Sequence, residues 1–275
     1  MEWIVQGDET DSSVIAKRLV DARRQASALP QYPGAIPASL DAGYACQDAA
    51  IPMWQSSIAG WKVGKIPDAW VEKLGEDRLV GPIFENRVQR PDDQRGTFAV
   101  IEGGFAAIEA EFIFVLAEDV PADKTAWTFE EAAAVVESLR VGVELAGSAL
   151  PDINRLGPPV VVSDYGNNAG LILGPVIADW QQRSMDDLTC ETFIDGVSVG
   201  TGRASSIPGG LLAALSFALS RCARRGLPLR AGQYVSTGAA TGIHDIVAGQ
   251  HARVEFPGFA VFEVEAVPAI AEVGA

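Results

Sequence analysis

The sequence predicts an α+β fold whose second part is a mainly β core, rolled or barrel-like in shape. Strand-like runs dominate the C-terminal part of the chain, and helices are interspersed among them irregularly. This order differs from the regular alternation of strand and helix that builds a doubly wound parallel sheet. Phosphate-binding signatures are also missing, because Gly200-Thr201-Gly202 follows a predicted hairpin strand and completes neither GxGxxG nor a GKS/T ending.

Charge and cysteine content restrict the expected partners. Across 275 residues, 36 Asp and Glu outnumber 21 Lys and Arg, which gives a net charge of −15. We therefore expect no binding to nucleic acid or to a membrane surface, since both need clustered basic side chains. The longest apolar stretch, around 210–219, is too short to span a bilayer. The N-terminus lacks the features of a secretory signal, and Cys46, Cys190 and Cys222 form no CxxC pair, so we expect a cytoplasmic protein.

Two helices are predicted near the N-terminus. Between residues 14 and 29, apolar side chains recur at helical spacing, and Pro30 ends the run. Farther along, Asp41, Tyr44 and Gln47 recur at every third residue, so in a helix they share one face. That face could line a cleft or could pack against the rest of the protein.

Two later helices have clear end signals. Thr128 and Glu131 have the form of a capping box ahead of the run AAAVVESLR, so a helix of about three turns is expected to start there. Another helix is expected after Pro208, with basic residues in its last turn. Gly226 suits the left-handed position that follows it.

Strand signals fill most of the C-terminal part. Residues 189–202 have the pattern of a hairpin that turns at Asp195-Gly196. Three more strands are expected over 232–238, 251–256 and 259–267. These elements supply most of the predicted β core.

The segment Ile108–Leu116 is the most informative one for chemistry. As a strand, it places Glu109 and Glu111 on one face, among apolar residues that predict burial on both faces. Two carboxylates are costly there unless something compensates them. Side chains two apart on a strand are roughly 7 Å apart at the backbone and can converge on one divalent cation. The alternative is that this end of the strand protrudes and its glutamates are solvated.

Glu144 is a third carboxylate among apolar neighbours, in the run Val141–Leu145. Three glutamates with open remaining positions suit Mg²⁺ or Mn²⁺, which prefer oxygen ligands and keep water or substrate in their shell. The only histidines are His244 and His251, which excludes most histidine-based zinc sites. A metal is therefore expected on carboxylates.

Lys62 lies in Gly60–Gly64, flanked by large apolar side chains. Desolvation there would disfavour the charged amine and bring it closer to proton transfer at neutral pH. The alternative is a lysine whose stem packs on apolar surface while its amine stays in water.

Val160–Val162 is expected to be a buried strand that runs into a polar turn. Asp164, Asn167 and Asn168 in that turn could position a substrate or a lysine. They could also serve only to make the turn, because Asp and Asn are common at strand ends.

Six segments share their order and spacing with a known family: GWKVG, RLVGPIF, IEAEFIFVL, VGVELAGS, SDYGNNAGLILG and GLPLRAGQYVSTG. On these motifs the chain resembles the 2-keto-4-pentenoate hydratase and 4-oxalocrotonate decarboxylase branch of the fumarylacetoacetate hydrolase superfamily. The likeness begins at about Asp41, where DAGYACQ is similar to an Asp-x-x-Tyr-x-x-Gln segment of that branch, and ends at about Val264.

The resemblance implies a mixed β-roll catalytic domain of the fumarylacetoacetate hydrolase type over 76–275, preceded by a helical N-terminal region over 1–75. It also implies a homo-oligomer, a dimer or larger, and allows a complex with another enzyme of the same pathway. Residue by residue, the resemblance assigns a divalent metal to three acidic side chains, Glu109, Glu111 and Glu144. It assigns catalysis to the lysine Lys62, with a supporting polar role for Asp164.

The chain departs from the family pattern in two segments. KIPDAWVEKLG, which follows the lysine, lacks the Ser/Thr-containing stretch common in the branch, which leaves the shape of the substrate loop open. Gln233 stands where the family usually has aspartate. No histidine precedes His244, and this counts against the hydrolytic members, which tend to use an early His-Glu pair.

The expected function is a metal-dependent hydratase of aromatic-compound catabolism. It would add water to a 2-hydroxy-dienoate or its 2-oxo-alkenoate tautomer and give a 4-hydroxy-2-oxo acid. The first alternative is decarboxylation of a 2-oxo-dienedioate, which needs a cationic pocket for the second carboxylate; Arg78, Arg87 and Arg203 are candidates. The second is a non-catalytic subunit that partners an active family member.

Overall fold

The computed structural model describes residues 8–272, and the side chains of residues 12–272. Its larger sheet is formed by β1 (Ile58–Lys65), β2 (Arg78–Phe84), β3 (Val88–Gln89), β5 (Phe105–Leu116), β6 (Val136–Ser148), β7 (Asn168–Val176), β10 (Tyr234–Ser236) and β11 (His244–Asp245). The strands lie in the order β2-β1-β10-β5-β6-β7-β3, and β11 pairs with β5.

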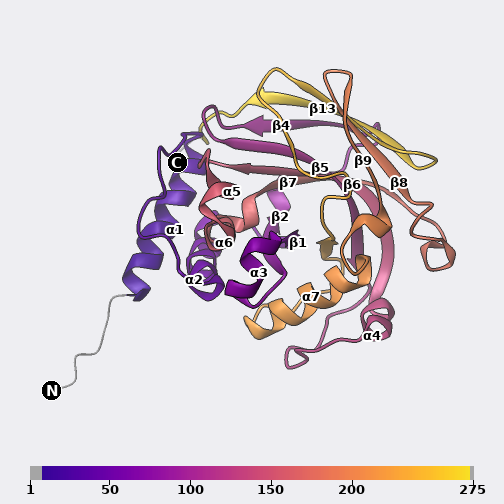
Figure 1. The fold of residues 1–275 in the computed structure, drawn as a ribbon, viewed down its shortest axis with the longest axis horizontal. Helices are drawn as coiled ribbons and strands as arrows, with labels where there is room; N and C mark the ends of the chain where they lie inside the picture. The colour runs from indigo at the N-terminus through magenta and orange to yellow at the C-terminus, as the bar shows by residue number, and fades with distance from the viewer. Residues whose placement is uncertain (1–7, 273–275) are drawn as a thin grey trace.

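The smaller sheet is formed by β4 (Arg95–Val100), β8 (Thr189–Ile194), β9 (Val197–Arg203), β12 (His251–Phe256) and β13 (Ala260–Pro268), in the order β4-β13-β12-β8-β9. The helices are α1 (Asp8–Arg24), α2 (Leu40–Ala50), α3 (Asp68–Leu74), α4 (Phe129–Ala134), α5 (Ile153–Leu156), α6 (Pro158–Ser163) and α7 (Leu211–Arg224). Figure 1 shows β4 and β13 on one side of the curved larger sheet, with α2, α3 and α7 gathered on the other. The predicted α+β class with a rolled sheet is confirmed.

The long strands β5 and β6 form the centre of the larger sheet. They pair antiparallel from Phe105↔Ser148 to Leu116↔Val136, and nearly every β5 side chain is buried. Both faces of β5 are covered, which explains why its sequence is almost continuously apolar. Its two glutamates are therefore placed in the interior of the protein.

Several elements follow directly from local sequence. Asp195 and Gly196 both adopt left-handed φ angles, +49° and +79°, as the two-residue turn between β8 and β9 requires. Helix α7 is preceded by Gly210 and followed by Gly226, whose φ of +72° suits the residue after a helix. The three predicted C-terminal strands correspond to β10, β12 and β13.

Two of the predicted helices end earlier than expected. Helix α1 begins at Asp8 rather than at residue 14, and it ends at Arg24 rather than at residue 29, because Ala26 takes a left-handed φ of +49° and turns the chain. The capping box of Thr128 and Glu131 is present, but α4 stops at Ala134. Val135 ends the helix and Val136 begins β6, where pairing with β5 outweighs the helical propensity of this alanine-rich segment.

The expected strand at 160–162 is wrong, since these valines lie in α6. Pro158 and Pro159 occupy the first turn of this helix, where proline's fixed φ is favourable. The helix packs against α2. Buried contacts of its valines therefore outweigh their β propensity.

Strand β1 lies inside the larger sheet, paired in parallel with β10 and antiparallel with β2. The layer of N-terminal helices therefore ends before Ile58, which is a reason to move the proposed boundary at residue 75 to that point. No described helix is long and apolar enough to cross a membrane. No disulfide joins the cysteines, all three of which are buried in the described part of the chain.

Candidate metal centre and active site

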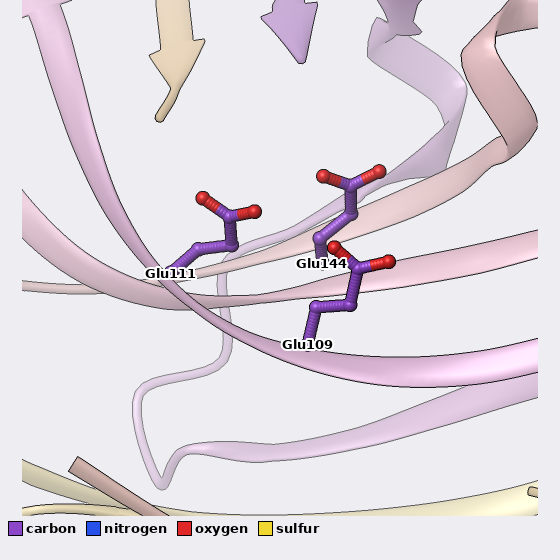
Figure 2. Close-up of side chains that lie close together, drawn as sticks. All are labelled: Glu109, Glu111 and Glu144. Atoms are coloured by element: carbon purple, nitrogen blue, oxygen red, sulfur yellow. The ribbon is translucent and has the colours of Figure 1, made fainter. Parts of the chain in front are cut away.

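Three glutamates meet where β5 and β6 pair. The strand register sets Glu109 directly opposite Glu144, and Glu111 follows two residues farther along β5. Each residue is at most 3% exposed, so the alternative of solvated glutamates is wrong. Each offers a carboxylate oxygen, and these atoms all lie within 4.8 Å of one another. Figure 2 shows the three carboxylates on the same side of the sheet, directed toward a common space.

Charge in this centre is costly without a counter-ion. Like charges opposite each other destabilise a strand pair, and burial adds a desolvation penalty. Burial, opposed by the charge of Lys62 and reinforced by that of Glu144, raises the pKa of Glu109 to about 7. Burial and the two neighbouring carboxylates also raise the pKa of Glu111 well above its usual value. In the metal-free centre, Glu109 and Glu111 therefore hold a proton to higher pH than ordinary carboxyl groups do.

The donor set fits a divalent cation. In each glutamate, one buried oxygen has no hydrogen-bond partner among the described residues: Oε1 of Glu109, Oε1 of Glu111 and Oε2 of Glu144. The other oxygen of Glu111 accepts a bond from the Gly238 N–H at 2.7 Å. The other oxygen of Glu144 accepts one from Asn168 at 3.2 Å. Carboxylates held in this way suit Mg²⁺ or Mn²⁺, so the buried triad that the sequence predicted could hold a divalent cation.

Lys62 reaches this centre from β1. Its Nζ lies 3.2 Å from Oε1 of Glu144 and donates to the carbonyl of Gly166 at 3.1 Å and to Oδ1 of Asn167 at 3.0 Å. The side chain is 5% exposed, so the alternative of an amine in water is wrong. Burial alone lowers the pKa of Lys62, but the charges of the three glutamates outweigh it and raise the pKa above its usual value. The expectation that desolvation dominates is therefore wrong for the metal-free protein.

A cavity of about 1170 Å³ opens from this centre, and its lining includes Lys62, Glu109 and Asn167. Helix α3 contributes to its outer wall. Of the three arginines considered for a second carboxylate, Arg78 lines this cavity, whereas Arg87 and Arg203 do not. Glu109 and Lys62 thus connect the carboxylate cluster to this cavity.

No protein-family model matches the chain. A protein from Burkholderia vietnamiensis strain G4 named 2-keto-4-pentenoate hydratase is 28% identical over 188 residues, which cover 66% of this chain and 68% of that protein. The solved structure of 4-oxalocrotonate decarboxylase from Pseudomonas putida G7, complexed with magnesium and adipate, matches with a TM-score of 0.78. Its sequence identity is 18%, over 94% of this chain and 98% of its own.

A more distant match is fumarylpyruvate hydrolase from Pseudomonas aeruginosa, in complex with Mn²⁺ and pyruvate. Its TM-score is 0.53 at 15% identity, over 76% of this chain and 88% of its own. The chain has the fumarylacetoacetate hydrolase fold. Its resemblance to the hydratase and decarboxylase branch is confirmed.

Within this fumarylacetoacetate hydrolase fold, one turn supplies partners to both the lysine and the metal centre. Tyr165, Gly166 and Asn167 all have left-handed φ angles, between +57° and +64°. The turn presses against β2, because a Cβ on Gly81 would lie 2.0 Å from the carbonyl oxygen of Tyr165. Asn167 thereby meets Lys62, and the next residue, Asn168, meets Glu144. This is the lysine-positioning role that the sequence left open for the turn.

Asp164 lies outside the contacts of Lys62. Its carboxylate pairs with Nε of Arg23 at 2.5 Å and accepts a bond from Ser148 at 2.5 Å. Both members of the ion pair are buried, with side chains 7% and 0% exposed. The structure thus gives Asp164 contacts that fix the turn to α1, and its role in catalysis stays a prediction.

Arg23 is the residue that the sequence did not reveal. Besides Asp164, its guanidinium binds the carbonyl oxygens of Gly147 at 2.7 Å and Asn168 at 3.1 Å. It therefore connects α1 to the ends of β6 and β7, close to the metal centre. Nothing in the local sequence distinguishes it, because it follows an ordinary amphipathic pattern and precedes a second arginine.

Proposed function

We propose that this protein is a divalent-metal-dependent lyase that hydrates a 2-hydroxy-dienoate, or its 2-oxo-alkenoate tautomer, during catabolism of aromatic compounds. The observation that carries the proposal is a cluster of three buried carboxylates in contact with one buried lysine, with Glu109 and Lys62 lining a cavity. The similar protein named 2-keto-4-pentenoate hydratase supports the reaction class. The magnesium and manganese complexes of proteins with this fold support the metal.

Glu109, Glu111 and Glu144 would hold Mg²⁺ or Mn²⁺. When bound, such a cation supplies Lewis-acid stabilisation of negative charge on an oxygen of the substrate, an effect worth several kcal/mol. The hydrogen bonds from Gly238 and Asn168 keep two of the carboxylates in place for this task. The carboxylate and C2 oxygen of the substrate would lie at this inner end of the cavity.

Lys62 would transfer the proton that moves during tautomerisation of the substrate. In the tautomerisation, the proton lost from the 2-hydroxyl group is replaced by one gained at C5, which leaves a 2-oxo-3-enoate. Water then adds, its hydroxyl to C4 and its hydrogen to C3, and the product is a 4-hydroxy-2-oxo acid. The bonds to Gly166 and Asn167 fix the amine at the inner end of the cavity, within reach of the carbon chain of a bound substrate.

The charges on the cavity wall favour hydration over decarboxylation of a 2-oxo-dienedioate. Arg78 is bound to Asp77 at 2.6 Å and to the carbonyl of Pro208. Lys65 is paired with Asp68 at 2.9 Å. Both basic side chains of the outer wall thus already have an aspartate partner, with which the second carboxylate of a dienedioate would have to compete.

A panel of short 2-hydroxy-dienoates with added Mg²⁺ or Mn²⁺, analysed for both hydration and CO₂ release, tests the proposal. Hydration without CO₂ is the expected result, and Glu111→Gln should abolish it while the exposed-site variant Glu265→Gln keeps it. Release of CO₂ from a dienedioate would instead identify a decarboxylase. No turnover of any compound by metal-loaded protein would indicate a non-catalytic subunit. We further propose that the protein works as a homo-oligomer, which sedimentation of the same preparation would test.

A further inference from the structure

The cavity is much larger than a five-carbon substrate needs. 2-Hydroxypenta-2,4-dienoate has eight non-hydrogen atoms, which at roughly 30 Å³ for each water-sized atom fill about 240 Å³. The cavity measures about 1170 Å³. Most of the space therefore lies beyond the part that the 2-oxo acid group would occupy beside Lys62 and Glu109.

The wall of this outer space is largely apolar. Val63, Leu79, Val161 and Ile207 contribute buried side chains to it. Ile243 also lines the cavity, yet it is 52% exposed to solvent. A ligand that extends outward would cover apolar surface that now faces water, and covering such surface is favourable.

Helix α3 forms one side of the opening, in the segment that departs from the family pattern. Val71 of this helix lines the cavity. Trp70 anchors the helix, because its ring lies so close to Gly157 that a Cβ there would come within 2.8 Å. The position of Val71 over the cavity is therefore fixed by packing, not by a loose loop.

The rim of the cavity is acidic. Its exposed carboxylates outnumber the basic side chains by four to two: Asp68, Glu72, Asp77 and Asp245 against Lys65 and Arg78. Both basic groups are already paired with aspartates of this same rim. A second negative charge at the far end of a substrate would thus meet an excess of like charge and would have to compete with these aspartates for the two basic side chains.

We propose that the natural substrate carries an uncharged apolar substituent of several carbons at the end remote from its carboxylate, and that α3 and Ile243 select this group. This inference rests on the proposed function, since it assumes that the 2-oxo acid end lies at the metal centre. It assigns the divergent segment after Lys62 a role in substrate specificity.

Calorimetric binding of unreactive 2-oxo acids to the full-length protein in MgCl₂ tests the inference without turnover. Along the series 2-oxopentanoate, 2-oxohexanoate and 2-oxooctanoate, affinity should rise about fourfold for each added methylene group that is buried. The dicarboxylate 2-oxooctanedioate should bind at least tenfold more weakly than 2-oxooctanoate. Affinity that is independent of length, or equal for the mono- and dicarboxylate, would overturn the inference.

Turnover then separates the inference from the proposed function. A 2-hydroxy-dienoate that carries an alkyl group on its terminal carbon should be hydrated with a higher kcat/KM than the unsubstituted compound. Hydration of the unsubstituted compound, with less efficient turnover of every longer one, would refute the substituent but keep the hydratase. Length-dependent binding with no hydration would support the apolar substituent but refute the hydratase.

A matched pair of variants locates the selecting surface. Val71→Phe should reduce the preference for long over short substrates about tenfold, because the larger ring fills the space that the substituent needs. Ala69→Phe, which places the same ring at an exposed position of the same helix outside the cavity lining, should leave that preference unchanged. Equal effects of the two variants would show that α3 does not select the substituent.

Discussion

Removing the metal should make the stability of the protein depend on pH between 5 and 8. In the metal-free folded state the pKa of Glu109 is about 7, against an ordinary value of 4.5. The folded state therefore keeps a proton that the unfolded state has released, and stability falls as the pH rises through this window. The difference between these two pKa values, about 2.5, corresponds to about 3 kcal/mol in the free energy of unfolding. This stabilisation is fully present below pH 4.5 and is lost above pH 7. The raised pKa of Glu111 acts in the same direction.

Thermal unfolding in EDTA at pH 5 and pH 8 measures this effect. With an unfolding entropy of about 2.1 cal/mol/K per residue, 3 kcal/mol corresponds to a loss of roughly 5 °C in Tm. Excess Mg²⁺ should restore the Tm at pH 8, because the cation takes the place of the protons. The lowered pKa of His244 works in the opposite direction and so cannot mimic the loss.

Two glutamine variants distinguish the effect of the metal centre on stability from the effect of charge repulsion across an acidic chain. Glu109→Gln should show a much smaller pH dependence than wild type, whereas Glu265→Gln, an exposed-site control, should behave as wild type. A metal-free wild type whose Tm is constant or rises from pH 5 to pH 8 would refute the reasoning. So would a Glu109→Gln variant with the slope of wild type.

Three further predictions concern single side chains. Glu111→Gln should remove the Tm increase caused by millimolar Mg²⁺ or Mn²⁺, since a ligand bound only by the folded state stabilises it by mass action; an unchanged increase would exclude Glu111 as a ligand. Lys62→Met should lower kcat by about 10² to 10⁴ at saturating metal. Lys62→Arg should be no more active, because a guanidinium stays protonated. Turnover within a few-fold of wild type for both variants would exclude proton transfer by Lys62. Arg23→Met should destabilise the protein by about 3 to 5 kcal/mol in chemical unfolding, because it leaves Asp164 buried without its partner; adding Asp164→Asn should recover much of the loss, and a loss below about 1 kcal/mol would show that the pair is unimportant.

The parts of the site that lie within one segment could be predicted from sequence. Alternation along Ile108–Leu116 correctly placed Glu109 and Glu111 on one buried face, because side-chain direction in a strand depends only on its own residues. The Asp195-Gly196 hairpin was predicted for the same reason. Local turn chemistry and periodicity do not depend on the rest of the fold.

The parts that join distant segments could not be derived in this way. Arg23 and Asp164 are 141 positions apart, and no local pattern links them. The apolar surroundings of Lys62 left both a buried and a solvated amine possible, and the direction of its pKa shift depends on carboxylates supplied by other strands. Likewise, the valines of α6 have strand propensity, and only their packing against α2 explains a helix there.

The reach of α1 limits how this chain could be recombined with a relative. A fragment that begins at Ile58 would contain every proposed metal ligand and the proposed catalytic lysine, yet it would lack the arginine that neutralises Asp164 and binds the carbonyls of Gly147 and Asn168. Exchange of the first fifty or so residues would therefore succeed only where the incoming helix has an arginine at the position of Arg23. The N-terminal helices and the larger sheet would otherwise have to be exchanged together.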